Sequence, residues 1–178
     1  MKWLDTPVWV PIDIPASKLP QGEQKLRQAL EELAVEKSPR YKARGGLTYC
    51  NVFATDVLRA MGAPPAHWVK PDGSEAPVGK GRELNANGIV RWMKTHGPKY
   101  HWTQADRQSA TDAAARGHLV LVGWDSGSNK PGHVAIMLPE GTIAQAGKRN
   151  FVGETISQGF GNLPVEFFVY MRGSHEST

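Results

Sequence analysis

The single cysteine of the chain, Cys50, occupies a position that suits a nucleophile. It follows the Gly45-Gly46 pair and stands directly before residues 51–61, whose apolar spacing is helical. A thiol at a helix start feels the positive end of the helix dipole, which favours the thiolate and lowers the thiol pKa. The free backbone N–H groups of the first helical turn can also stabilise an oxyanion. The competing interpretation is a buried cysteine that only fills space.

His133 is the candidate general base for that thiol. It opens an apolar segment directly after Pro131-Gly132, so its side chain should stand at the rim of a sheet. A histidine at a strand end is more often a solvated or hydrogen-bonded residue without a chemical role. Beside a cysteine at a helix start, it is the natural partner in a Cys-His dyad.

A third group must orient the imidazole, and Gln145 is the first candidate. If residues 139–141 form a hairpin loop, Gln145 is the diagonal neighbour of His133 on the same face of the sheet. A two-residue loop would shift the register and put the two side chains on opposite faces. Asp125 and Asn162 are alternatives for this role, but the sequence does not fix their positions.

The elements that must position these residues change from helical to strand periodicity along the chain. Helical spacing predicts helices over residues 21–36, 51–61 and 87–95, and a short one near 110–115. Strand-like runs follow at 118–124, 133–138, 142–146 and 165–170. Helices that precede an antiparallel sheet indicate the α+β class.

The chain of 178 residues fits one domain with a sizeable core. We expect an extended N-terminal arm over residues 1–20, a single domain over 21–174 and a tail over 175–178. No segment approaches the roughly 18 apolar residues of a membrane span, and the start lacks the apolar run of a signal peptide. We therefore expect synthesis in the cytoplasm without a signal peptide, and no internal disulfide.

Charge and motifs exclude several classes of function. The net charge of +4 comes from scattered basic residues, which disfavours nucleic-acid binding but is compatible with attraction to an anionic polymer. No P-loop or dinucleotide fingerprint is present. The histidines at 96, 101 and 118 lack metal-ligand spacing, so we expect no metal and no cofactor.

Five successive blocks carry a family resemblance: GGLTYCNVFATDVLRAMG, ELNANGIVRWM, GHLVLVGWDSG, PGHVAIMLPEG and IAQAG. Their order of cysteine helix, middle helix, strand, histidine strand and polar third residue resembles the papain-like peptidoglycan amidases. That group spans CHAP domains, NlpC-type endopeptidases and the amidase effectors of type VI secretion. Two departures stand out: Tyr49-Cys50-Asn51 replaces the usual Asp-Cys-Ser of NlpC-type enzymes, and Gln145 replaces a His, Asn or acid.

The resemblance implies a papain-like fold, in which N-terminal helices pack on an antiparallel sheet that carries the histidine. It also implies a cysteine peptidase or amidase that hydrolyses an amide bond of the cell-wall stem peptide, or the bond that joins this peptide to the glycan. Cys50 would be the nucleophile and His133 the base, with Gln145 as the third member of the site. A tyrosine upstream of the cysteine serves the oxyanion side in NlpC-type enzymes, and both Tyr41 and Tyr49 are candidates for that role.

Further residues are candidates for substrate binding: Tyr49, Asn51, His67, Trp68 and Asn87. His67 and Trp68 lie in a long Pro- and Gly-rich loop and could form one wall of the cleft, or an exposed structural pair. Asn85 and Asn87 could cap the third helix or bind peptide carbonyls.

The implied partner is the peptidoglycan substrate, with a holin, a secretion system or an immunity protein according to the biological setting. We expect a monomer that acts on the wall, in the periplasm or outside the cell, after release or delivery. Two alternatives remain open. One is a non-catalytic wall- or protein-binding domain with this fold, and the other is a papain-like deamidase or transferase that acts on proteins.

Overall fold

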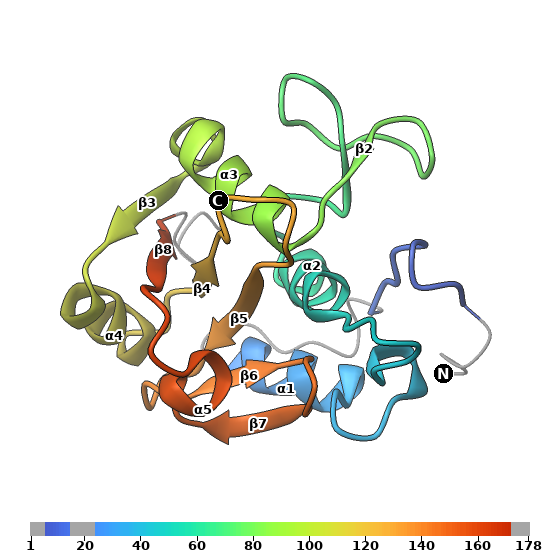
Figure 1. The fold of residues 1–178 in the computed structure, drawn as a ribbon. Helices are drawn as coiled ribbons and strands as arrows, with labels where there is room; N and C mark the ends of the chain where they lie inside the picture. Colours follow the sequence, from blue (N-terminus) through green and yellow to red (C-terminus); the bar gives the residue numbers. More distant parts are fainter. Residues whose placement is uncertain (1–5, 15–23, 172–178) are drawn as a thin grey trace.

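The computed structural model describes residues 6–14 and 24–171. The predicted tail at 175–178, and residues 1–5 and 15–20 of the predicted arm, lie outside the described residues. The described residues form helices and antiparallel sheets, so the α+β class is confirmed (Figure 1).

The main sheet has six antiparallel strands in the order β3-β8-β4-β5-β6-β7. Their bounds are Trp102–Ala105 (β3), Val120–Trp124 (β4), His133–Met137 (β5), Ile143–Gln145 (β6), Phe151–Glu154 (β7) and Glu166–Tyr170 (β8). The last of these strands is inserted between β3 and β4. A separate two-stranded sheet pairs β1 (Trp68–Val69) with β2 (Arg82–Glu83).

Helices cover both faces of the main sheet. They are α1 (Lys25–Leu33), α2 (Cys50–Ala60), α3 (Ala86–Thr95), α4 (Arg107–Ala115) and α5 (Ile156–Phe160), with short 3-10 turns at Pro39–Tyr41 and Gly97–Tyr100. Side chains alternate along a strand, so Val134 and Ile136 pack in the core with α1, α2 and α3. Ala135 and Met137 pack on the other face with α4 and α5. The sheet is therefore the middle layer of three.

The hairpin between β5 and β6 has the register that the sequence predicts. The Leu138 N–H donates to the Thr142 carbonyl at 2.8 Å, which leaves residues 139–141 as the loop. Gly141 has a φ of +83°, a left-handed conformation that glycine adopts without steric cost. Ile136 faces Ala144 across the ladder, so the counting that brings Gln145 beside His133 is confirmed.

Helix α2, like α1, has no side-chain cap at its N-terminus. Its N-cap residue, Tyr49, makes no side-chain hydrogen bond to the first turn. Helices α3, α4 and α5 are instead capped by the side chains of Asn85, Asp106 and Thr155. The first backbone N–H groups of α2 are therefore left without a side-chain cap.

Part of the predicted arm packs against this scaffold. Ile12 and Ile14 are buried in the core with α1 and α2. The Arg40 guanidinium donates to the carbonyls of Pro7 and Val10, at 3.2 and 2.8 Å. Residues 6–14 therefore belong to the folded domain. Among the described residues, no helix is both long and apolar enough to span a bilayer.

Candidate active site

His133 and Gln145 meet in a buried hydrogen-bond chain. The His133 Nε2 and the Gln145 Oε1 are 2.7 Å apart, and the Gln145 Nε2 donates to the Arg149 carbonyl at 3.0 Å. Because the amide nitrogen is committed to that carbonyl, the amide oxygen must accept from the imidazole. His133 therefore carries its proton on Nε2, which leaves Nδ1 as the unprotonated nitrogen.

Residues of α5 pack around this pair. The ring of Phe160 packs on the His133 ring with 4.7 Å between centroids. A side chain at Gly159 would have its Cβ only 2.5 Å from the Gln145 Oε1, so glycine leaves the space that the amide occupies. Burial lowers the pKa of His133, and the hydrogen bond to Gln145 opposes that shift by raising it.

Cys50 is the first residue of α2, and its sulfur reaches the start of β5. The N–H groups of alternate strand residues point to the same side, so Val134 directs its N–H toward β6, as Leu138 does. The ladder to β6 pairs only Ile136 and Met137 of β5, which leaves the Val134 N–H without a strand partner. The backbone N–H of Val134, the residue after His133, lowers the pKa of the Cys50 thiol, so the thiol lies near the start of β5.

The resting state of the thiol differs from the sequence-based expectation. Burial raises the pKa of Cys50, and backbone N–H groups of Val134, Asn51 and Cys50 itself lower it only in part. The predicted net lowering by the helix dipole was wrong, because the side chain is only 5 % exposed and the loss of solvation outweighs the dipole. The dyad therefore rests as a neutral thiol and a neutral imidazole.

The start of α2 supplies donors for a developing negative charge. The backbone N–H groups of Cys50 and Asn51 both lower the pKa of the thiol, which places them near the sulfur. No side chain caps these positions, so an oxygen that formed on a carbonyl attacked by the thiol could accept from them.

Within the described residues, no hydrogen bond joins the Cys50 thiol to the His133 ring. Such contacts are often long in a free enzyme and shorten in the substrate complex. Proton transfer from the sulfur to Nδ1 would require a substrate that brings the two groups together.

Among the predicted substrate-binding residues, Tyr49 and Asn51 flank the thiol. Tyr49 is half-buried, and the Arg44 guanidinium lies over its ring at 5.1 Å. The Asn51 Nδ2 donates to the Leu84 carbonyl at 2.9 Å, which ties the site to the end of the β1–β2 region. Tyr41 is buried and donates to Asp56, so Tyr49 is the tyrosine that remains beside the nucleophile.

His67 and Trp68 are not an exposed pair. His67 is buried, with Nδ1 3.3 Å from the Thr55 hydroxyl and Nε2 2.8 Å from the Glu83 carboxylate. The Trp68 ring is half-buried and donates to the Trp9 carbonyl of the arm. Of the two predicted alternatives, the exposed pair is wrong for His67, because α2 and β2 enclose it.

The two asparagines of α3 have structural contacts. Asn85 caps the helix by accepting from the Gly88 N–H at 2.8 Å, one of the roles predicted for it. Asn87 is buried, and its amide group bonds to Ser126, Ser128 and Lys130 in the loop before β5. Asn87 therefore holds the loop that leads to His133.

The two alternatives to Gln145 are occupied elsewhere or exposed. Asp125 forms a two-point ion pair with Arg91, at 2.7 and 2.9 Å. Asn162 lies exposed after α5.

Sequence reasoning missed α5 and with it Phe160, the ring that covers His133. A signal was present: Thr155 and Gln158 form a capping box, the S/T-x-x-E/Q pattern of a helix start.

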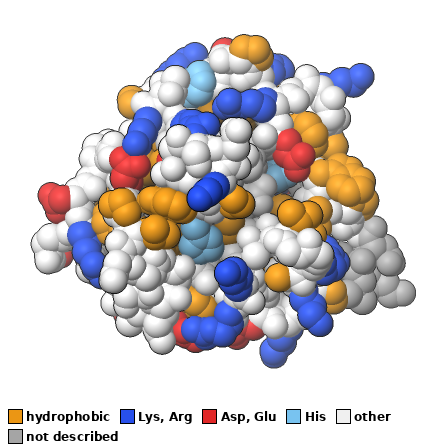
Figure 2. All heavy atoms as spheres, viewed as in Figure 1, with side chains coloured by type: hydrophobic (Ala, Val, Ile, Leu, Met, Phe, Trp, Pro, Cys, Tyr) orange, Lys and Arg blue, Asp and Glu red, His pale blue; other side chains and the backbone are white. Residues whose placement is uncertain are grey.

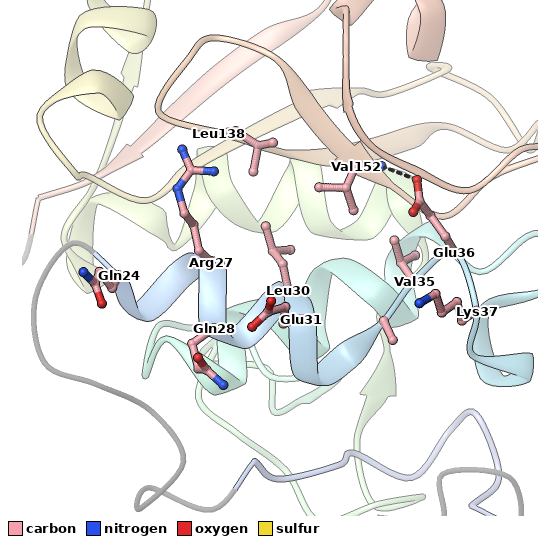
Figure 3. Close-up of a pocket in the computed structure, with 11 residues that line it drawn as sticks. Gln24, Arg27, Gln28, Leu30, Glu31, Val35, Glu36, Lys37, Leu138 and Val152 are labelled. Carbon is pink, nitrogen blue, oxygen red and sulfur yellow. Dashed lines mark hydrogen bonds between the residues drawn. The ribbon is translucent and has the colours of Figure 1, made fainter.

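Two hollows lie outside this cluster. One, of about 680 Å³, separates α1 from the end of β5 and from β7, where Leu30, Leu138 and Val152 face one another (Figure 3). The other, of about 960 Å³, lies between the β1–β2 region and α3. Neither is lined by Cys50, His133 or Gln145. Within the described residues, no group of three His, Cys, Asp or Glu side chains could hold a metal ion.

The face drawn in Figure 2 carries a band of hydrophobic side chains and a histidine across its middle, with Lys and Arg on both sides of it. A scan against protein-family models finds no family that matches this chain. A search of curated proteins likewise finds no match. The chemistry of the site therefore rests on its own geometry.

Proposed function

We propose that this protein is a papain-like cysteine hydrolase that cleaves an amide bond of peptidoglycan. The observation that carries the proposal is the His133–Gln145 hydrogen bond of 2.7 Å beside a thiol at an uncapped helix start. A histidine with a fixed tautomer, a neighbouring thiol and free backbone donors are the parts that acyl transfer requires.

In the proposed reaction, His133 Nδ1 takes the proton of the Cys50 thiol as the sulfur attacks the substrate carbonyl. The tetrahedral oxyanion accepts hydrogen bonds from the N–H groups of Cys50 and Asn51. The imidazolium then protonates the leaving amine, and a thioester to Cys50 remains. Water attacks this thioester with His133 again as the base, which releases the acid and restores the thiol.

The substrate class follows from the sequence resemblance and is supported by charge. The order of the motif blocks resembles papain-like peptidoglycan amidases, and a net charge of +4 favours approach to an anionic polymer. The band of apolar side chains with basic margins in Figure 2 suits a peptide substrate that carries carboxylates.

The test is digestion of purified peptidoglycan by the wild type and by Cys50→Ala, with muropeptides separated and weighed by mass spectrometry. We expect new amine and carboxyl ends with the wild type and none with Cys50→Ala. The matched control is Ser157→Ala, an exposed change in α5 that leaves the site intact. Equal digestion by wild type and Cys50→Ala would contradict the proposal.

The same digest separates the alternatives. A folded wild type that digests no wall preparation, but still reacts at Cys50 with iodoacetamide, would favour a deamidase or transferase acting on proteins. A folded wild type whose thiol stays inert would favour a non-catalytic domain. Either result contradicts the proposed activity.

A further inference from the structure

The hollow between the β1–β2 region and α3 is lined by apolar side chains and by charged ones. Val69, Pro71 and Trp92 provide the apolar part of its lining. The Trp92 indole donates to the Gly73 carbonyl at 3.0 Å, which fixes the loop to the helix. The loops around β2 project from the body of the fold in Figure 1.

The charged side chains that line the hollow are all positive. Lys70, Lys80 and Arg82 line it, and none of them forms an ion pair within the described part of the chain. Arg91 also lines it but is paired with Asp125. This hollow therefore gathers three positive charges without an ion-pair partner, in a chain whose net charge is only +4.

The acidic residues of this region are turned to other partners. Glu75 pairs with Arg59, and Glu83 pairs with His67. The Asp72 carboxylate accepts from the backbone and hydroxyl of Ser74, and the charges of Lys99 and Lys70 also help to lower its pKa. No acidic side chain lines the hollow among the described residues, so its field is not cancelled from within.

The hollow is also connected to the candidate active site through the chain. Asn51, the neighbour of Cys50, donates to the Leu84 carbonyl. Arg82 stands two residues before Leu84, about 7 Å along an extended strand. A polymer bound at Cys50 therefore needs to extend only a short way to reach the rim.

We infer that this hollow is an anion-binding exosite that holds carboxylate or phosphate groups of the wall polymer while Cys50 acts on a neighbouring bond. The inference rests on the proposed function for the identity of the polymer. Arg82 offers a planar pair of donors, and Lys70 and Lys80 add point charges, an arrangement that suits several anionic groups on one strand.

The test measures binding separately from cleavage, in a Cys50→Ala background. Lys80→Glu/Arg82→Glu is compared with Arg107→Glu/Arg116→Glu, an equal change of charge at two exposed positions, the first residue of α4 and its C-cap, on the other face of the sheet. Co-sedimentation with insoluble sacculi at low salt should show about tenfold weaker binding for the first pair, and little change for the second. Thermal unfolding checks that both variants are folded.

Chemically treated sacculi identify the anion. Loss of binding after amidation of carboxyl groups assigns it to carboxylates, and loss after hydrofluoric acid extraction assigns it to phosphates. Binding that survives both treatments, or that weakens equally in the two charge-reversed pairs, overturns the inference.

The two proposals fail separately. Hydrolysis by the wild type with no effect of the Lys80/Arg82 change removes the exosite alone. Charge-dependent binding without any hydrolysis removes the proposed activity alone.

Discussion

Two polar clusters near helix α2 differ in how completely their members are hydrogen-bonded to one another. At the middle of α2, the Asp56 carboxylate accepts from Arg40 at 2.9 and 3.3 Å and from the Tyr41 hydroxyl at 2.6 Å. Arg40 uses its other N–H groups on the carbonyls of the arm. On the sheet that packs against α2, a partly buried chain of bonds from Arg149 through Gln145 ends at His133. We call the first cluster closed, because Asp56, Arg40 and Tyr41 bond to one another. We call the second open, because its chain of bonds stops at the His133 ring.

The difference separates a structural cluster from a reactive one. Burial and the neighbouring Asp56 raise the pKa of Tyr41, which keeps its hydroxyl a donor and the closed cluster saturated. The open cluster ends at an unprotonated imidazole nitrogen, and Cys50 lies at the uncapped start of α2 in the core that also contains Val134, the next residue after that histidine. Stability should therefore depend mainly on the first cluster and activity on the second.

The largest expected effect lies in the closed cluster. Asp56→Ala leaves the Arg40 guanidinium buried without its carboxylate, which should cost about 3–5 kcal/mol of unfolding free energy. The measurement is urea denaturation. Asp13→Ala, which breaks a surface pair with Arg59, should cost less than about 1 kcal/mol. Equal losses in the two variants would mean that burial does not distinguish these pairs.

The second effect concerns the pH dependence of the open cluster. Burial lowers the pKa of His133, so kcat/KM should fall only when the pH drops below about 6.5, as the base becomes protonated. Gln145→Leu keeps the site dry but removes the bond that raises this pKa. It should therefore move the acid limb to lower pH and reduce kcat/KM about tenfold.

Gln145→Glu is the matched variant, and it should shift the pKa of His133 in the opposite direction. A carboxylate beside the ring favours the imidazolium, so the acid limb should move to higher pH. The rate of Cys50 alkylation against pH gives an independent readout. If both variants shift the limb in the same direction, Gln145 does not act through the imidazole.

The smallest effect tests the uncapped helix start. Tyr49→Ser and Tyr49→Ala both remove the ring, but only serine can cap the first turn. Tyr49→Ser should be more stable than Tyr49→Ala by about 1 kcal/mol. Its turnover should be lower, because a hydroxyl at the N-cap can accept from the Asn51 N–H, one of the two proposed oxyanion donors. A serine variant with higher stability and unchanged turnover would show that these donors serve no oxyanion.

Local signals were sufficient for much of this fold. Helical spacing predicted α2 and α3, and the short loop at 139–141 predicted the register that joins His133 to Gln145. These features depend on neighbouring residues, so a sequence can reveal them. The predicted helix over residues 21–36 is shorter in the structure, because Ala34 takes a left-handed conformation after Leu33.

Features that depend on distant parts of the chain were not predictable. Strand β3 has the short sequence Trp102–Ala105 and pairs only with β8, and β7 contains Gly153 and spans only Phe151–Glu154. The burial of Cys50, which sets the direction of its pKa, arises from contacts with β5. His67 is enclosed by Thr55 and Glu83, residues that no local pattern brings together.

The insertion of β8 between β3 and β4 has a consequence for the order of folding. His133 and Gln145 are only 12 residues apart, so their hairpin can form from local contacts alone. The strand that joins β3 to β4 comes after every other strand in the chain, and closing such long loops costs entropy before any contact offsets it. The hairpin that carries the imidazole should therefore form early during refolding, and enzymatic activity should return only when β8 has docked.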